Sequence, residues 1–280
     1  MIGSLRSTLA TAWRDPGGRA GVFLLAALVA LAIVGPWFLP DPTRIADLGA
    51  PASPPSSAHP LGTDHLSRDL LARIATGARI SLAVAAIAVT LSLTIGTAVG
   101  IVAGLAGGVI DDLLMRIVDG ALAIPRLFIL LLLLVVWDRV PLGALIAVIG
   151  ATGWFATSRL VRGEVLRLRN EEYLHAAVAL GAGRARTIFR HLLPNVAGVI
   201  LVSATLSIGD VILLEAGLSY LGVGVQPPTP SWGVMVFDAR NSMTTAPWTL
   251  FFPGIAIVLT VLATSLVGDA LRAAFDPRGA

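Results

Sequence analysis

Apolar and polar stretches alternate along the chain in a pattern typical of membrane proteins. A helix needs about 20 apolar residues to cross the hydrocarbon core of a bilayer. Six apolar segments approach or reach that length: 21–39, 81–105, 118–137, 141–158, 196–218 and 250–267. The pattern predicts an all-α polytopic membrane protein with six transmembrane helices. The first segment is long for a cleaved signal peptide and further spans follow it, so we expect a retained helix.

Composition agrees with this class of protein. The chain is 56% hydrophobic and 13% charged, and its mean hydropathy is +0.85, which soluble domains rarely reach. It has no cysteine, which excludes disulfides and cysteine-ligated metal sites. All 20 basic residues are arginine, so the chain lacks the phosphate-binding lysine of a P-loop and any Schiff-base lysine.

The arginines are unevenly distributed between the two sides of the predicted membrane. With the N-terminus inside, 14 arginines lie on the inner side and 6 on the outer side. The positive-inside rule therefore places both termini and the polar segment 171–195 in the cytoplasm. Because topology accounts for the basic pI of 10.4, we do not expect a nucleic-acid partner.

This topology divides the chain into five parts. Residues 1–20 form a cytoplasmic N-terminal segment and 21–39 the first transmembrane helix. Residues 40–78 form an extracytoplasmic loop, in which Thr63 or Asp64 is a candidate cap for a short amphipathic helix starting at His65. The remainder is a five-helix core, 79–270, and a cytoplasmic tail, 271–280.

The longest polar segment after residue 80 is 171–195, which predicts two short helices joined by a glycine-rich break. Residues 173–180 are rich in alanine and leucine, which favour helix. The following Gly-Ala-Gly permits a left-handed turn at residues 181–183. Residues 184–193 resume a helical pattern, and Pro194 ends it or opens the next element. Its arginines exclude this segment from lipid, so we expect it to project into water and contact a partner.

The sequence HAAVALG, followed by nine residues and then HLLP, resembles the EAA motif in permease subunits of binding-protein-dependent ABC importers. His175 stands at the usual glutamate position and His191 replaces the usual isoleucine, as is common in the peptide branch of that family. The residues that match at the right spacing are Ala176, Ala177, Gly181, Leu193 and Pro194.

Two further motifs carry the same resemblance. The first, LGTDHLSRD, is similar to the LGTDxxGRD segment of C-type subunits in dipeptide, oligopeptide and nickel importers, with Ser67 where glycine is usual. The second, GLSYLGVGVQPPTPSWG at 217–233, closely resembles the corresponding stretch of those subunits. Its prolines and Trp232 by themselves indicate a stiff loop at the membrane interface. The matching residues of the first motif are Leu61, Gly62, Thr63, Asp64, Arg68 and Asp69.

The resemblance covers residues 21–278 and implies a type I importer permease fold, with a peripheral first helix and a five-helix core. It implies a heterodimer with a homologous B-type permease, two ATPase subunits and an extracytoplasmic substrate-binding protein in a bacterial or archaeal cytoplasmic membrane. ATP and magnesium would bind the ATPases, and this chain would bind no cofactor and catalyse no reaction. The implied substrates are dipeptides, oligopeptides, nickel or similar small solutes.

The resemblance also implies that residues 173–185 form a coupling helix seated in an ATPase subunit. Closing of that partner would then move the transmembrane helices as rigid bodies. Gly181 would supply the bend, and Pro194 would tie the motif to the next span. The expected coupling residues are Tyr173, His175, Ala176, Ala177, Leu180, Gly181, Ala182, Gly183, Arg184 and Pro194.

Some residues within the predicted spans are candidates for a role in the pathway or in helix packing. Asp210 and Glu215 are ionisable side chains in the fifth span and hence functional candidates. Asp210 is not typical of the family and either lines the pathway or pairs with another subunit. A small-residue stripe allows close approach of another helix, and its members are Gly96, Gly100 and Gly104. A polar turn is expected at 111–116, and Asp119 is expected to pair with Arg126 near the membrane surface.

An alternative class is a secondary transporter or channel driven by an ion gradient, with Asp210 and Glu215 as proton or cation sites. It would predict inverted repeats, and no convincing repeat is present. The four histidines are scattered, and no cluster of His, Asp and Glu has metal-ligand spacing. A purely structural scaffold would leave the three motifs unexplained.

Overall fold

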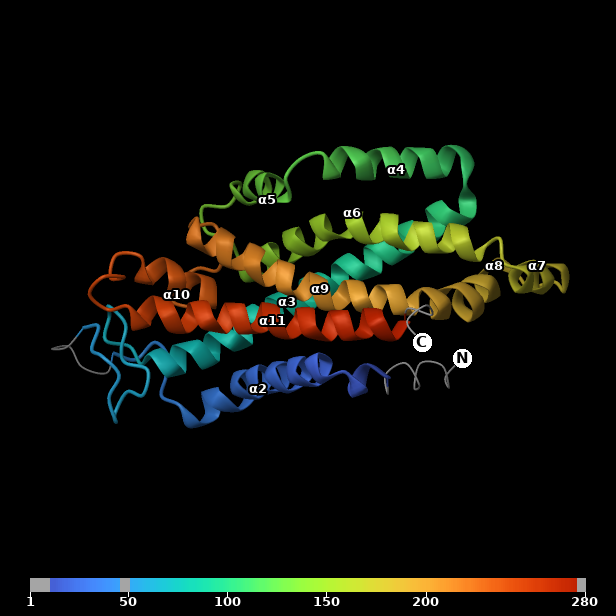
Figure 1. The fold of residues 1–280 in the computed structure, drawn as a ribbon. Helices are drawn as coiled ribbons and strands as arrows, with labels where there is room; N and C mark the ends of the chain where they lie inside the picture. The colour runs from blue at the N-terminus through green and yellow to red at the C-terminus, as the bar shows by residue number, and fades with distance from the viewer. Residues whose placement is uncertain (1–10, 46–50, 276–280) are drawn as a thin grey trace.

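The computed structural model describes residues 11–45 and 51–275, which form an elongated helical bundle (Figure 1). The described part contains two isolated β-bridges but no β-strand. The helices are α2 (Pro16–Phe38), α3 (Leu70–Ala106), α4 (Gly108–Leu122), α5 (Arg126–Leu134), α6 (Leu142–Leu168), α7 (Glu172–Ala179), α8 (Arg184–Arg186), a π-helical turn (Thr187–Leu192), α9 (Leu193–Tyr220), α10 (Trp232–Ala239) and α11 (Trp248–Phe275).

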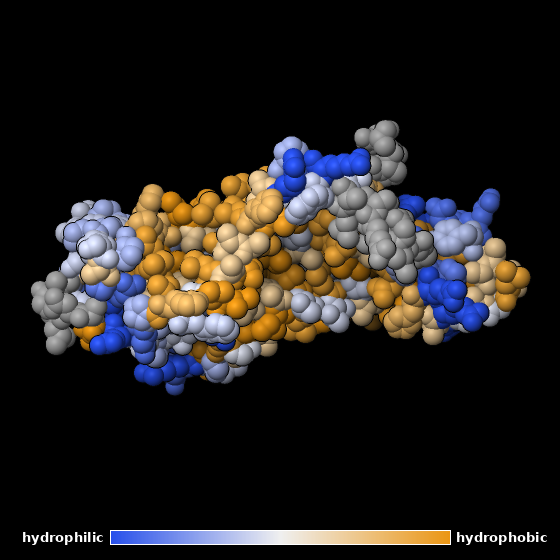
Figure 2. Space-filling view, turned by 90° about the horizontal axis from the view of Figure 1, so that it is seen from below, coloured by the Kyte–Doolittle hydropathy of each residue, from blue (hydrophilic) through white to orange (hydrophobic). Residues whose placement is uncertain are grey.

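Five helical segments are long and apolar enough to cross a membrane, and the bent pair α4–α5 is a sixth candidate. The five are α2, α3, α6, α11 and the continuous stretch Arg184–Tyr220 that contains α9. Many large apolar side chains on these helices face outward, and Figure 2 shows a broad hydrophobic surface along the body, with hydrophilic patches at both ends and one further patch along an edge. This arrangement confirms the predicted all-α membrane protein.

Helices α3 and α6 make the most extensive contact in the bundle, and the glycine stripe lies in that contact. An added Cβ on Gly100 would lie 2.6 Å from the backbone oxygen of Ser158, and one on Gly104 would lie 2.7 Å from Val165 Cγ1. An added Cβ on Gly96 would lie 2.7 Å from Thr157 Cβ. Small residues allow such close packing of membrane helices, where no hydrophobic effect drives association. The helix that packs on the stripe therefore belongs to the same chain.

The remaining helices enclose a core with two parts. Helix α11 packs against α9 and α2, and α3 also contacts α9 and α2, so α2 lies at the periphery. The larger part of the core occupies the middle of the bundle and the end near α10. A smaller apolar cluster lies where α6 leads into α7, at the opposite end of the molecule (Figure 1).

The structure differs from the predicted elements in the first loop. No short helix starts at His65, and neither Thr63 nor Asp64 is a helix cap. Instead Asp69 caps α3, its Oδ1 accepting a hydrogen bond of 2.8 Å from the backbone N–H of Ala72. Helix α3 therefore begins at Leu70, well before the apolar segment, because this single strong cap lies upstream of the hydrophobic pattern.

The predicted third span, 118–137, is also wrong. Helix α4 begins at Gly108 and meets α5 at an angle of 85°. Pro125 lies in the break, where its ring and missing N–H disfavour a continuous helix. The predicted polar turn at 111–116 is also wrong, because these residues lie within α4. Their charged side chains belong to the polar face of an amphipathic helix and do not interrupt it.

Other spans extend beyond the predicted bounds. Helix α6 continues to Leu168, and α11 continues to Phe275, because arginines and acidic residues extend each helix past the apolar segment. The stretch after α9 contains helix α10, in which Trp232 is fully buried. Trp232 is therefore a core residue whose ring is not exposed to lipid or water.

Candidate functional site

The segment 171–195 forms one tip of the molecule, at the ends of α6 and α9 (Figure 1). Helix α7 is two turns long and carries one buried side chain, Leu174. Leu174 joins a small apolar cluster that includes Leu168 of α6 and Leu192 of the π-helical turn. This single apolar anchor holds α7 to the bundle while its other faces stay open to solvent.

Helix α7 ends in a Schellman turn. The backbone N–H of Ala182 donates to the carbonyl of Ala177 at 3.0 Å, and the N–H of Gly181 donates to the carbonyl of Val178 at 2.9 Å. Gly181 has φ +86°, a left-handed conformation that glycine adopts without strain. Nothing lies within 4 Å of a Cβ added there, so only backbone conformation restricts this position.

The chain returns to the bundle through α8 and a π-helical turn, and Pro194 lies at the first turn of α9. Because the helix is continuous from Arg184, the missing N–H of Pro194 removes one helical hydrogen bond directly after the π-helical turn, where the hydrogen-bond spacing changes. Asn195 Nδ2 lies 2.6 Å from the carbonyl oxygen of His191 and 3.4 Å from the Tyr173 hydroxyl. Burial, and secondarily the charge of Glu171, raises the pKa of Tyr173, so this linking hydroxyl is neutral at physiological pH.

The outer surface of this segment mixes apolar and basic side chains. Leu180 is 89% exposed and Phe189 is 70% exposed. His175, Ala176, Gly183 and Arg184 are exposed as well. Within the described part of the chain the exposed arginines at 184, 186 and 190 make no ion pair. Phe189 and the last two arginines were not predicted as contact residues, although a large aromatic in a basic segment is a visible signal.

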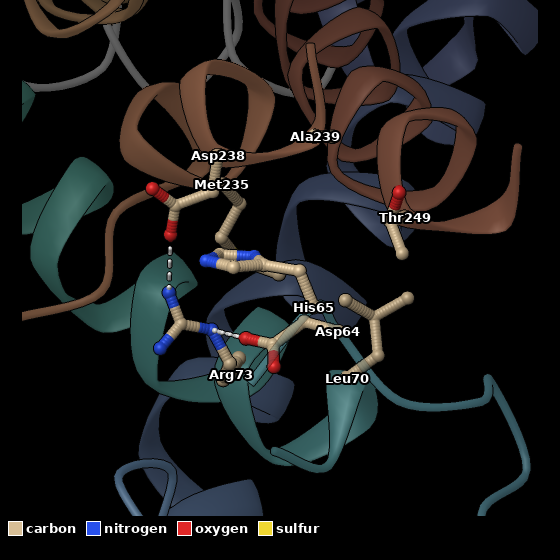
Figure 3. A pocket seen from close by; sticks show the side chains of 8 residues that line it. All are labelled: Asp64, His65, Leu70, Arg73, Met235, Asp238, Ala239 and Thr249. Atoms are coloured by element: carbon tan, nitrogen blue, oxygen red, sulfur yellow. Dashed lines mark hydrogen bonds and ion pairs between the residues drawn. The ribbon is translucent and has the colours of Figure 1, made fainter. Parts of the chain in front are cut away.

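A second polar region lies at the opposite end, and its charges are buried (Figure 3). Asp64 Oδ2 lies 2.7 Å from Arg68 Nε and 3.2 Å from Arg73 Nε. Asp238 of α10 lies 3.3 Å from Arg73 Nη2 and 3.4 Å from Arg68 Nη2. Arg73 is 2% exposed, and its Nη1 has no hydrogen-bond partner. Figure 3 shows the His65 ring packed beside Met235 above this network.

The loop residues of the first motif shape this network. The backbone amides of Leu66 and Arg68 both donate to Asp64 Oδ1 at 2.9 Å. Asp69 caps α3 and its Oδ2 lies 2.7 Å from His59 Nδ1. Ser67 has φ +56°, a left-handed backbone conformation that favours glycine over other residues. The motif therefore encodes a folded loop with internal charge pairing.

Glu215 is fully buried and binds three serines from three parts of the chain. Its Oε1 accepts hydrogen bonds from Ser219 at 2.7 Å and Ser231 at 2.8 Å, and its Oε2 accepts one from Ser81 at 3.2 Å. The same Ser81 oxygen accepts from the backbone N–H of Trp232 at 3.3 Å. Glu215 therefore fastens α3, α9 and α10 together, and a side chain without exposed surface argues against its predicted place in a pathway.

Asp210 and Arg126 occupy a different environment. Asp210 is exposed on α9 and shares a hollow with Arg126, which is the first residue of α5. The prediction that Arg126 pairs with Asp119 is wrong. Its Nη2 donates to the carbonyl of Ile149 at 2.6 Å, and Asp119 instead forms an ion pair with Arg159 of α6. The 85° bend between α4 and α5 separates the two predicted partners.

Among the described residues, no group of three or more His, Asp and Glu side chains could hold a metal ion.

Residues 96–279 match the family of binding-protein-dependent transport system inner membrane components. The chain belongs to this family. It is 41% identical over 258 residues to the oligopeptide transport permease OppC of Bacillus subtilis, covering 92% of this chain and 84% of that protein. It is also 41% identical to the dipeptide permease DppC of the same organism over 260 residues, which is 92% of this chain and 81% of that one. The Haemophilus influenzae OppC is 37% identical over 268 residues, covering 95% and 86%.

The fold is shared with a solved transporter. A chain in inward-facing structures of the MetNI methionine ABC transporter superposes with a TM-score of 0.57 at 20% identity, over 71% of this chain and 95% of that one. This likeness concerns the fold, and it confirms the predicted importer-permease architecture. The chain is thus an inner-membrane permease component with several membrane-spanning helices, and it is not itself a catalytic subunit.

Proposed function

We propose that this chain is one of two permease subunits of an ATP-driven importer that takes up dipeptides or oligopeptides from a binding protein. Its relatives of about 41% identity are an oligopeptide and a dipeptide permease, which supports peptides over nickel or another small solute. A homologous permease would supply the other half of the pathway.

The exposed segment 171–195 is the observation that carries this proposal. Two short helices, joined by a Schellman turn and anchored by Leu174, present apolar and basic side chains that find no partner within the described chain. Such a surface suits insertion into a groove of another protein. We assign that groove to one of two ATPase subunits, in which ATP and magnesium bind, and we place this segment and both termini in the cytoplasm.

Residues with direct contact in this proposal are those on the open faces of α7 and the turn. His175, Ala176, Leu180, Gly181 and Arg184 are exposed and suit that role. The half-buried Ala177 and Ala182 and the linking Tyr173 and Pro194 suit a role in holding the segment to α9. Movement of the ATPase would then reach the bundle through the apolar cluster around Leu192.

A mild-detergent purification of the tagged chain from its native membrane tests the assembly. We expect a second permease of similar size and P-loop ATPase subunits to co-purify. Reconstituted in proteoliposomes, that complex should take up a labelled peptide only with ATP and the peptide-loaded binding protein. Purification of the chain alone or as a homo-oligomer, with uptake driven by an ion gradient, would overturn the proposal and favour the alternative transporter.

A further inference from the structure

A groove follows one face of α9 over most of its length. Two hollows, of about 460 Å³ and about 440 Å³, are lined by successive turns of this helix and meet at Asp210, which lines both. The lined stretch runs from Gly198 to Gly217. At 1.5 Å per residue it spans roughly 30 Å, close to the thickness of the hydrocarbon core. The groove is thus long enough to serve as one wall of a membrane pathway.

Two opposite charges lie in the hollow of about 440 Å³ among apolar side chains. Arg126 and Asp210 line it together with Leu127, Leu213 and Leu214. Asp210 is close enough to act electrostatically on Arg126, but the two side chains form no ion pair with each other. Asp210 makes no ion pair elsewhere in the described chain. Each charge is therefore available to a group that enters the groove.

Arg126 is held in place from behind by α6. Its Nη2 donates to the carbonyl of Ile149 at 2.6 Å, and its Nε lies 3.5 Å from Thr152 Oγ1. These neutral acceptors orient the guanidinium without neutralising its charge. An arginine fixed in this way presents a pre-oriented donor to a carboxylate.

Ionisable side chains within membrane segments are costly unless they pair or face a water-filled cavity. Here Asp210 and Arg126 face one groove, whose other hollow is lined by Arg272, and no ion pair joins any of them. Each of these charges can therefore contact a charged group that enters from outside the chain. A bare divalent cation does not fit, because Arg126 would repel it. A molecule that carries an ammonium and a carboxylate group complements both residues at once, and a peptide with free termini is such a molecule.

Building on the proposed peptide importer, we propose that Asp210 and Arg126 form a charge-selective subsite in the translocation groove. Asp210 faces the ammonium terminus of a passing peptide, and Arg126 faces its terminal carboxylate. Separate charges on a mostly apolar wall give brief, reversible contacts, which suit a pathway that must also release its cargo. This subsite would select free peptides after the binding protein has released them.

Photo-crosslinking in the complete importer tests the subsite without relying on the binding protein. A benzophenone-bearing residue at position Leu213 would capture a labelled free dipeptide, and unlabelled dipeptides would compete. We expect free dipeptide to compete about tenfold better than its N-acetylated or its C-amidated form, as for one lost charge contact. Asp210→Asn should remove the discrimination against N-acetylation only, and Arg126→Gln that against C-amidation only. Asp210→Glu should restore it, and Ser207→Ala, in the same groove, should change nothing.

Three results would overturn the subsite: equal competition by free and blocked dipeptides, unchanged discrimination in Asp210→Asn, or loss of the second permease from the Asp210→Asn complex. The last would show that Asp210 pairs with that permease. ATP-dependent uptake by the unmodified importer separates this failure from failure of the proposed function. If uptake persists while discrimination is absent, only the subsite is wrong, whereas absence of ATP-dependent peptide uptake removes the peptide importer as well.

Discussion

The two polar ends of this protein use their charges in opposite ways. At the end near α10, Asp64, Arg68, Arg73 and Asp238 are largely buried and form ion pairs with one another, although Arg73 Nη1 has no hydrogen-bond partner. At the α7 end, large apolar side chains are exposed, and the exposed arginines 184, 186 and 190 form no ion pair within the described chain. Both regions look similar in a hydropathy profile. The comparison shows that polar residues outside the membrane serve either the fold or a partner, and burial distinguishes the two.

The largest expected effect is on the buried network. Asp64→Ala leaves Arg68 and Arg73 without their main counter-ion, and breaking a buried ion pair from one side costs about 3–5 kcal/mol. We expect a clear fall in the unfolding temperature of the purified complex, followed by tryptophan fluorescence. The control is Asp41→Ala, at an exposed aspartate whose partner is the neighbouring Thr43. Equal stability of both variants would contradict the assignment of this end to the fold.

The next effect concerns the turn of the exposed end. Gly181→Val forces a β-branched residue into φ +86°, a strain of about 1–3 kcal/mol. We expect ATP-dependent uptake to fall about tenfold or more while the complex assembles and still hydrolyses ATP, because the strain distorts a contact and leaves the core intact. Gly163→Val is the control, since Gly163 lies in α6, outside the segment 171–195, and a Cβ added there also meets nothing within 4 Å. Normal uptake by Gly181→Val would show that the turn at Gly181 is not needed for coupling.

A smaller effect is expected at the exposed apolar side chains. Phe189→Ser removes no internal packing of note, so the free energy of unfolding should change by no more than about 0.5 kcal/mol. Only a minority of interface residues cost more than about 1 kcal/mol when truncated, and a large exposed aromatic is a candidate for that minority, so we expect ATPase association to weaken about fivefold to tenfold. Titration of ATPase subunits onto the permease pair measures this. Leu66→Ser, also exposed but at the other end, should leave association unchanged; equal losses in both would contradict the comparison.

The smallest expected effect is a gain in stability at the end near α10, in the loop that contains Ser67. Ser67 adopts φ +56°, which costs an L-residue roughly 1–2 kcal/mol, and glycine avoids most of that cost. Ser67→Gly should therefore stabilise the complex by about 1 kcal/mol or less, after the entropy cost of glycine. Thermal unfolding beside Ser57→Gly, an exposed loop position, measures the difference. Destabilisation by Ser67→Gly would show that its side chain contributes contacts that outweigh the strain.

The sequence alone determined the class of protein and its local punctuation. Long apolar segments leave helix as the structure that satisfies backbone hydrogen bonds in lipid, so the all-α membrane fold follows from composition. Gly181 permits a left-handed turn and Pro194 removes one helical hydrogen bond, because these are properties of single residues. The stripe of Gly96, Gly100 and Gly104 likewise predicted close helix packing. The sequence pattern did not predict helix α4, because charged residues interrupt its apolar positions. Pro125 was the local indication of the bend between α4 and α5.

Only the tertiary structure decided which residues meet. Arg73 and Asp238 lie 165 positions apart, and no local pattern indicates that they pair. Glu215 and Asp210 are similar acidic residues on one helix, yet one is buried among serines and the other faces a groove. A helix places side chains on faces by its period, whereas its neighbours decide which face is buried. The physical role of each charge therefore depends on packing between distant segments, which no single stretch of sequence contains.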